Sequence, residues 1–204
     1  MAAEGATFYY TSKQAFDFKR AYTFLAESGL YIKHPDIQMI SGIYIDEFEE
    51  LDVEKIEEMF NTNRMGIHLR LENKDRIFWS FGEDKVFAHN IGNLFDEYHE
   101  KVVSEASIQF ALSEINTNEE FLGFTLNILG VYEEYDFETI FDPDNSEILT
   151  HRYFADITFL PKEKFNKVSL NDECKIIQLN QRFDCIAKNE ELSNYLKSLL
   201  QSQS

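Results

Sequence analysis

Glycine and proline are scarce in this chain, whereas aromatic residues are abundant. The 204 residues include 8 Gly and 3 Pro, against 19 Phe and 10 Tyr. Tight β-turns and flexible linkers both depend on Gly and Pro, so this composition disfavours a β-sandwich with many short turns and disfavours long linkers. Hydrophobic residues make up 44% of the chain, which is enough for a substantial core. We expect one large domain or two small ones.

Four segments show the capping and stop signals of helices. Ser12 is the predicted N-cap of a helix that ends near Gly29, and Asp52 is the predicted N-cap of a helix through about residue 61. Asn90 is predicted to cap a helix through about residue 104, with residues 105–115 also favoured as helix, and Asn189 is predicted to cap the last helix.

Strand signals fill most of the remaining chain. Alternating or continuous apolar residues bounded by turn residues predict strands at 7–10, 37–45, 66–72, 76–81, 86–89, 121–131, 137–141, 147–159, 174–179 and 183–187. Short turns separate several of these segments, which favours antiparallel pairing. The expected fold class is α+β, with a mostly antiparallel sheet and flanking helices.

Two segments 99 residues apart follow a similar plan. Residues 76–90 and 175–189 each read as strand, turn, strand and an Asn cap before a helix, and Ile77, Ala88 and Asn90 recur as Ile176, Ala187 and Asn189. This pattern suggests two similar βββα-type modules, with a division near residues 105–118. Chance is the competing explanation, because three identities are few. Residues 1–204 are otherwise treated as a single unit.

Motifs for catalysis, cofactors and metals are missing from the sequence. Neither a Gly-rich phosphate loop nor a G-x-S-x-G elbow occurs. Cys174 and Cys185 lack features that would activate a thiol, and we expect both to be reduced. The spacings of the five histidines do not converge on a metal, and the calcium-like start at Asp142 fails at later positions of the loop. We therefore predict no catalytic residues, no metal and no cofactor.

Charge and the terminal sequence indicate a compartment and exclude some partners. The N-terminus lacks the basic and apolar regions of a secretion signal, and the longest apolar stretches are too short to span a membrane, so we expect a cytoplasmic protein. The net charge is −18. A chain this acidic should repel nucleic acid and anionic lipid and attract basic proteins.

The acidic residues are concentrated in the middle of the chain. Residues 102–151 contain eleven Asp or Glu and no Lys or Arg. Carboxylates can steer a basic partner, and aromatic residues can anchor an interface. The predicted partner-binding residues are Tyr132, Glu133, Glu134, Tyr135, Asp136, Glu138, Phe141, Asp142 and Asp144. The competing interpretation is a solvated acidic face whose aromatic residues alternate into the core.

The C-terminal segment carries a family resemblance. A strand ending in Cys185-Ile186-Ala187-Lys188-Asn189 leads into a helix with Leu192, Tyr195 and Leu196. This arrangement resembles the end of the SUKH superfamily of bacterial immunity proteins. The resemblance covers about an eighth of the chain, and the N-terminal landmarks of that superfamily are not recognisable. It implies a protein that binds a cognate toxin and blocks it.

Three functional hypotheses follow. The first is a binding protein that neutralises a basic partner, such as a nuclease toxin, by covering its active site. The second is a DNA mimic, whose carboxylates replace phosphates and which binds a DNA-handling enzyme. The third is a metal-dependent hydrolase that uses Asp142, Asp144 and His151.

Overall fold

The structure of the protein is a computed structural model of the whole chain. It describes residues 5–37, 40, 52–62, 66–83, 85–92, 96–128, 137–142, 144–150 and 154–201, and only the backbone of residues 53, 59, 62, 137 and 138.

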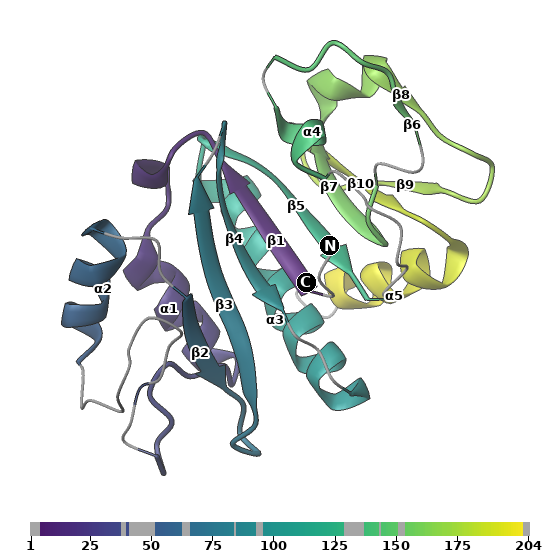
Figure 1. Cartoon of the computed structure of the whole chain (residues 1–204). Coiled ribbons are helices and arrows are strands. Elements are labelled where there is room, and N and C mark those ends of the chain that lie inside the picture. The colour runs from purple at the N-terminus through teal and green to yellow at the C-terminus, as the bar shows by residue number, and fades with distance from the viewer. Residues whose placement is uncertain are drawn as a thin grey trace.

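An antiparallel sheet forms the centre of the protein (Figure 1). Its eight described strands lie in the order β2-β3-β4-β1-β5-β7-β10-β9, and every neighbouring pair is antiparallel. The strands are β1 (Gly5–Tyr10), β2 (Gly66–Arg70), β3 (Arg76–Glu83), β4 (Phe87–Gly92), β5 (Phe121–Asn127), β7 (Ile157–Pro161), β9 (Lys175–Gln178) and β10 (Phe183–Ala187). Two further short strands, β6 (Leu149–Thr150) and β8 (Val168–Ser169), pair in parallel. The predicted α+β class with a mostly antiparallel sheet is confirmed.

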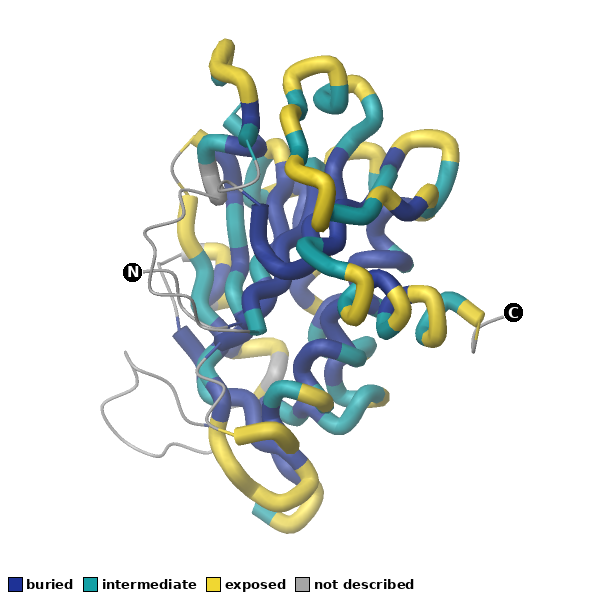
Figure 2. The backbone as a smooth tube through the Cα atoms, turned by 90° about the vertical axis from the view of Figure 1, so that its right-hand side faces the viewer, coloured by how far each residue is buried: buried dark blue, intermediate teal, exposed yellow. Residues whose placement is uncertain are grey.

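Helices cover one face of the sheet (Figure 1). They are α1 (Phe18–Glu27), α2 (Val53–Thr62), α3 (Glu97–Thr117) and α5 (Glu190–Gln201), and apolar side chains from all four join the same core cluster. Helix α4 (Phe137–Phe141) packs on the opposite face. The short 3-10 segments η1 (Lys13–Ala15) and η3 (Lys162–Lys167) follow β1 and β7. In Figure 2 the buried positions are concentrated in the strands and along the helix α3.

Local capping bonds explain where the helices begin. The carboxylate of Asp52 accepts the N–H of Lys55 at 2.8 Å, and the side chain of Asn189 accepts the N–H of Leu192 at 2.9 Å, so both predicted caps are confirmed. The same bond is made at the start of α1 by Asp17 and at the start of α3 by Asp96.

Two other predicted caps are wrong. Ser12 makes no side-chain cap bond and precedes only the 3-10 segment η1. Asn90 lies inside β4, where its Nδ2 donates to Thr7 Oγ1 at 2.8 Å and to the carbonyl of Ala6 at 3.2 Å. The cross-strand partner on β1 therefore competes successfully with a local helix cap, and the next helix begins only after Asp96.

Three strand predictions need correction or fall outside the described residues. Residues 137–141 form the helix α4 rather than a strand. The predicted strand at 147–159 is replaced by two short strands, β6 and β7. Most of the predicted strand at 37–45 lies outside the described residues, and within it Ile37 forms an isolated bridge with His34.

The two faces of β1 belong to different cores. Phe8 and Tyr10 face the helices, within the larger cluster, while Tyr9 faces α4. The ring of Tyr9 stacks on that of Phe141, with centroids 4.2 Å apart. Gly123 on the neighbouring strand has a φ of +155°, and a Cβ there would overlap the Phe141 ring. The absence of a side chain at Gly123 thus makes room for α4 on this face.

The two segments of the suggested repeat lie toward opposite edges of one sheet. β3 and β4 form one antiparallel pair and β9 and β10 form another. The second strand of each pair is the inner one, so the order of the two strands along the sheet is reversed between the pairs. The helices that follow, α3 and α5, pack on the same face. A rotation that aligns the strand directions and superposes the two hairpins would put these helices on opposite faces. The two-module division stays a hypothesis that would require one hairpin to have changed its order.

Truncation of Phe141 tests its place in the core. We expect Phe141→Ala to lower the free energy of unfolding by about 3–5 kcal/mol, because a buried ring is lost and a cavity is left. Urea denaturation followed by circular dichroism measures this loss. Tyr98→Ala is the control, because Tyr98 is 41% exposed and its loss should cost within about 0.5 kcal/mol. Equal losses for the two variants would contradict the assignment.

Candidate functional site

The structure describes only part of the predicted binding surface. Tyr132, Glu133, Glu134, Tyr135 and Asp136 lie outside the described residues, and so does the side chain of Glu138. The three remaining residues, Phe141, Asp142 and Asp144, lie at the end of α4 and in the loop that follows it.

Phe141 has a core role rather than the predicted role of a partner-contacting anchor. Its side chain is 1% exposed and packs against Tyr9 and Gly123. The correction follows from the local fold, because residues 137–141 turn as a helix whose last residue points at the sheet.

Asp142 is paired within the protein. Its Oδ2 accepts a hydrogen bond from Lys85 Nζ, and its Oδ1 accepts the N–H of Asp144 at 2.9 Å. The bond from Lys85 lowers the pKa of the Asp142 carboxyl, and the backbone bond lowers it further. Both oxygens of Asp142 therefore have partners within the protein, and the bond to Lys85 connects the loop to the segment just before β4. Asp144, by contrast, is exposed.

Lysines from outside the acidic stretch lie against it. Lys164 on η3 donates to the carbonyl of Ile140 at 2.7 Å, and Lys167 donates to the carbonyl of Asn145 at 2.9 Å. Together with Lys85 they line an open cavity of about 470 Å³ whose apolar wall includes Ile140 and Phe141. The stretch without basic residues is thus neutralised in part by lysines that are distant in sequence.

The loop after α4 is ordered by its own side chains. Asn145 Nδ2 donates to the carbonyl of Thr139 at 3.0 Å, and Asn145 Oδ1 accepts the N–H of Glu147 at 2.8 Å. We call residues 142 and 144–148 the acidic loop. Its exposed members are Asp144, Ser146, Glu147 and Ile148.

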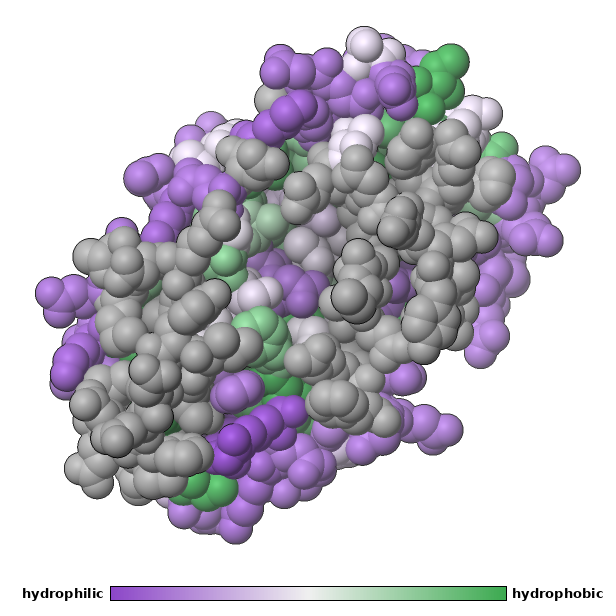
Figure 3. Space-filling model, in the orientation of Figure 1, coloured by the Kyte–Doolittle hydropathy of each residue, from purple (hydrophilic) through white to green (hydrophobic). Residues whose placement is uncertain are grey.

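Ile148 was not predicted as a functional residue, yet it is the most exposed large apolar side chain of the described chain, at 66%. Only Tyr98 and Ile176 are comparably exposed among the described large hydrophobic residues. In Figure 3 the coloured part of the surface, which leaves out the grey residues, is mostly hydrophilic with small apolar areas. Ile148 follows three polar residues, and no alternation of polar and apolar residues leads up to it. The sequence therefore does not predict that its side chain is exposed.

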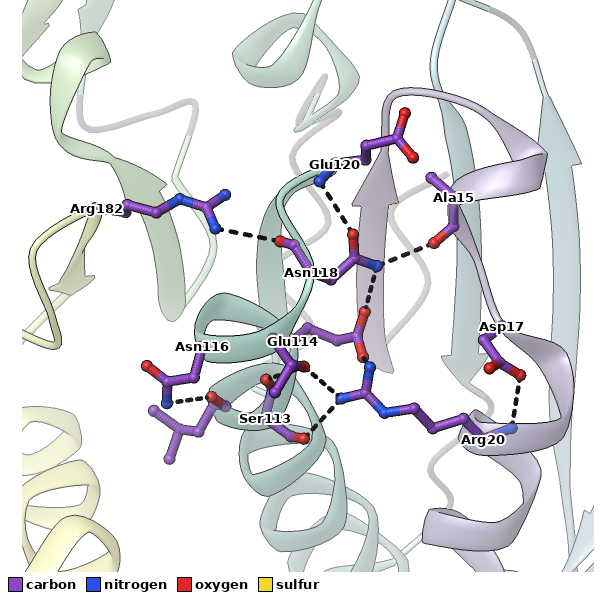
Figure 4. Close-up of polar contacts among 11 residues, drawn as sticks. Ala15, Asp17, Arg20, Ser113, Glu114, Asn116, Asn118, Glu120 and Arg182 are labelled. Carbon is purple, nitrogen blue, oxygen red and sulfur yellow. Dashed lines mark hydrogen bonds and ion pairs between the residues drawn. The ribbon is translucent and has the colours of Figure 1, made fainter.

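A second polar cluster joins the helices α1 and α3 (Figure 4). Glu114 of α3 is 3% exposed, and its Oε1 lies 3.0 Å from Nη1 of Arg20. Arg20 also donates to Ser113 Oγ at 2.8 Å and to Thr117 Oγ1 at 2.7 Å. Burial raises the pKa of Glu114, while Asn118 and Arg20 lower it. Burial and the nearby charge of Glu114 raise the pKa of Tyr10.

Asn118 extends this cluster to the turn between β9 and β10. Its Nδ2 donates to Glu114 Oε2 at 2.9 Å and to the carbonyl of Ala15 at 2.9 Å. Its own carbonyl accepts a bond from Arg182, at the turn between β9 and β10, at 3.3 Å. The cluster therefore ties together four parts of the fold, and we assign it a structural role, since its charged groups are engaged with one another.

His89 is the centre of the aromatic core. It is 1% exposed, accepts a hydrogen bond from Trp79 Nε1 on its Nδ1 at 3.1 Å, and stacks on Phe8 with centroids 4.5 Å apart. Burial lowers its pKa well below the usual value. A neutral imidazole surrounded by rings is a core residue rather than a catalytic base, because no polar group of a substrate could reach it without disrupting the core.

The two cysteines are unreactive, and the predicted hydrolase site is only partly described. Cys174 and Cys185 are both free, and burial raises the pKa of each thiol, so both stay protonated at neutral pH. His151, the predicted partner of Asp142 and Asp144 in a metal site, lies outside the described residues.

Comparisons with known proteins identify no relative. No protein-family model, curated protein or solved structure matches the chain. None of the described helices is long and apolar enough to cross a membrane.

His89 should make stability depend on pH. Its pKa is lowered in the folded protein, whereas an unfolded histidine titrates near about 6.5. The unfolded state therefore binds the proton first, and stability should be complete above about pH 6.5 and fall as the pH drops below it, by up to about 1.4 kcal/mol per pH unit. Urea denaturation between pH 7.5 and 5.5 measures this slope. In His89→Gln, which keeps an acceptor for Trp79, the slope should be smaller; an unchanged slope would contradict the prediction.

Loss of the Asn118 side chain should destabilise the α1–α3 junction. We expect Asn118→Ala to cost about 1–3 kcal/mol, because Glu114 would lose a donor at a buried carboxylate. The control is Asn116→Ala, since Asn116 is exposed and bonds only to Asn180 and the Leu112 carbonyl among the described residues. Chemical denaturation compares the two. A cost for Asn118→Ala no larger than that for Asn116→Ala would be evidence against the junction.

Proposed function

We propose that this protein is a binding protein that neutralises a basic partner protein by covering its functional surface. The acidic loop is the proposed centre of the interface, and the observation that carries the proposal is the exposure of Ile148 beside Asp144 and Glu147 on an ordered loop.

Order in the loop supports a binding role. The bonds of Asn145 to Thr139 and Glu147, and the bond of Lys167 to the Asn145 carbonyl, hold the loop in one conformation. A loop that is ordered before binding loses less conformational entropy when a partner docks. The pair between Lys85 and Asp142 contributes to the same end, because it fixes the start of the loop.

The composition of the loop fits an interface with a basic protein. An exposed isoleucine can enter an apolar pocket at the centre, while carboxylates around it meet Lys or Arg side chains of the partner. The net charge of −18 adds long-range attraction, which raises the association rate of a basic partner.

The partner class follows from this chemistry together with the family resemblance at the C-terminus. A toxin whose active site is basic, such as a nuclease, is the partner that best fits an acidic loop and an occluding mechanism. The described carboxylates of the loop are clustered within a few residues, which supports occlusion of one site over mimicry of an extended DNA backbone.

Two isoleucine variants test the interface. We expect the wild-type protein, used as bait in an extract of its native source at low salt, to recover a basic protein that 0.5 M salt releases, because salt screens charge pairs. Ile148→Asp should lower this recovery at least about tenfold, as loss of a central anchor does. Ile176→Asp is the matched control, because Ile176 is 55% exposed on the edge strand β9, outside the acidic loop, and recovery should be unchanged.

Circular dichroism and thermal melting should show that both variants fold as the wild type does. Failure to recover any basic protein, or equal recovery by Ile148→Asp and the wild type, would contradict the proposal.

A further inference from the structure

A cluster of metal-ligating side chains lies at the opposite end of the fold from the acidic loop. Asp75 comes from the turn between β2 and β3, and Asp96 and His99 come from the start of α3. The ligand atoms of the three residues all lie within 4.8 Å of one another. No motif in the sequence predicts this cluster, because Asp75 is far from the other two residues along the chain.

The distances match the requirements of a small divalent ion. His99 Nε2 lies 3.1 Å from Asp75 Oδ2 and 3.8 Å from Asp96 Oδ2. Tetrahedral ligands about 2.0–2.2 Å from a zinc ion lie about 3.3–3.6 Å apart. The two observed distances bracket this range, and the two carboxylates offer oxygens within 4.8 Å of each other, so side-chain rotations would bring the three atoms to one ion.

Burial and exposure are arranged as in an open metal site. The side chain of His99 is 4% exposed and is fixed by packing, whereas the two carboxylates reach solvent, with side-chain exposures of 51% and 53%. An ion could therefore enter from solvent between the carboxylates and keep a water molecule as its fourth ligand. Three protein ligands and one water molecule are the usual set of an open zinc site.

Neighbouring groups hold the two carboxylates in place. Asn73 Nδ2 donates to Asp75 Oδ2 at 2.6 Å, and Asn73 Oδ1 accepts the N–H of Asp75 at 3.0 Å. Asp96 uses its other oxygen, Oδ1, to accept the N–H of His99 at 2.9 Å. Each carboxylate is thus oriented by a second bond, as is common for ligands at metal sites.

The chemistry of the set selects among ions. An imidazole nitrogen with two carboxylates suits zinc and related transition metals, whereas Mg²⁺ and Ca²⁺ prefer oxygen ligands alone. The positive end of the α3 helix dipole opposes a cation here. The charges of Asp75 and Asp96, with Glu97 and Glu100 in the first helical turn, offset that effect.

We propose that Asp75, Asp96 and His99 form a binding site for one Zn²⁺ ion, which joins the β2–β3 turn to the start of α3. This site is independent of the partner surface proposed above. The competing explanation is a hydrogen bond between His99 and Asp75 that needs no metal.

Calorimetric titration of Zn²⁺ into the EDTA-treated full-length protein at pH 7.5 tests the proposal, and the visible absorption of added Co²⁺ provides a second readout. We expect one Zn²⁺ per chain, a higher melting temperature with Zn²⁺ that EDTA reverses, and no such effect of Mg²⁺. Asp75→Asn and Asp96→Ser should each weaken Zn²⁺ binding at least about tenfold, since loss of even a supporting group costs this much.

The variants are chosen to leave the fold intact. Asp75 and Asp96 are exposed, and serine at position 96 can still cap α3. Asp36→Asn is the matched control, because Asp36 is an exposed carboxylate that pairs with the neighbouring Lys74 at 3.2 Å but is not part of the cluster. Its Zn²⁺ binding should equal that of the wild type. Absence of Zn²⁺ binding, or equal binding by all four proteins, would overturn the proposal.

Discussion

Strand β1 joins the two sides of the sheet. It pairs with β4 on one side and with β5 on the other, so that Phe8 lies opposite both His89 and Phe124. Without β1, the strands β2, β3 and β4 would share no described ladder with β5, β7, β10 and β9. Both cores depend on this strand, because Tyr9 packs against Phe141, just before the acidic loop, from one face and Phe8 packs against His89 from the other.

Charge in this protein has two different roles. The buried carboxylate of Glu114 pairs with the partly exposed Arg20 and contributes to the junction of α1 and α3. The carboxylates of the acidic loop stay near solvent, with one of them, Asp142, engaged by Lys85. Groups of the first kind are engaged with one another, and only groups of the second kind support the proposed interface. The distribution of charge along the sequence does not separate them.

Local signals were sufficient for much of the fold, and long-range contacts explain what they missed. The caps Asp52 and Asn189 were predicted correctly because each bonds to a backbone N–H only three residues away. Asn90 has the same chemistry but bonds to Thr7 across the sheet. The lysines that meet the acidic stretch, and the place of Phe141 over Gly123, likewise depend on contacts between distant segments. The cluster of Asp75 with His99 was missed for the same reason.

The position of β1 also has a consequence for the order of folding. A ribosome releases Phe8 long before it releases His89 and Phe124, so the central strand must wait for both of its neighbours. Until they arrive, its apolar and aromatic side chains have no sheet to join. Pairing of this kind is slow because loops must close between distant segments first. The nascent chain is therefore most exposed to aggregation, and most in need of a chaperone, before β5 has been synthesised.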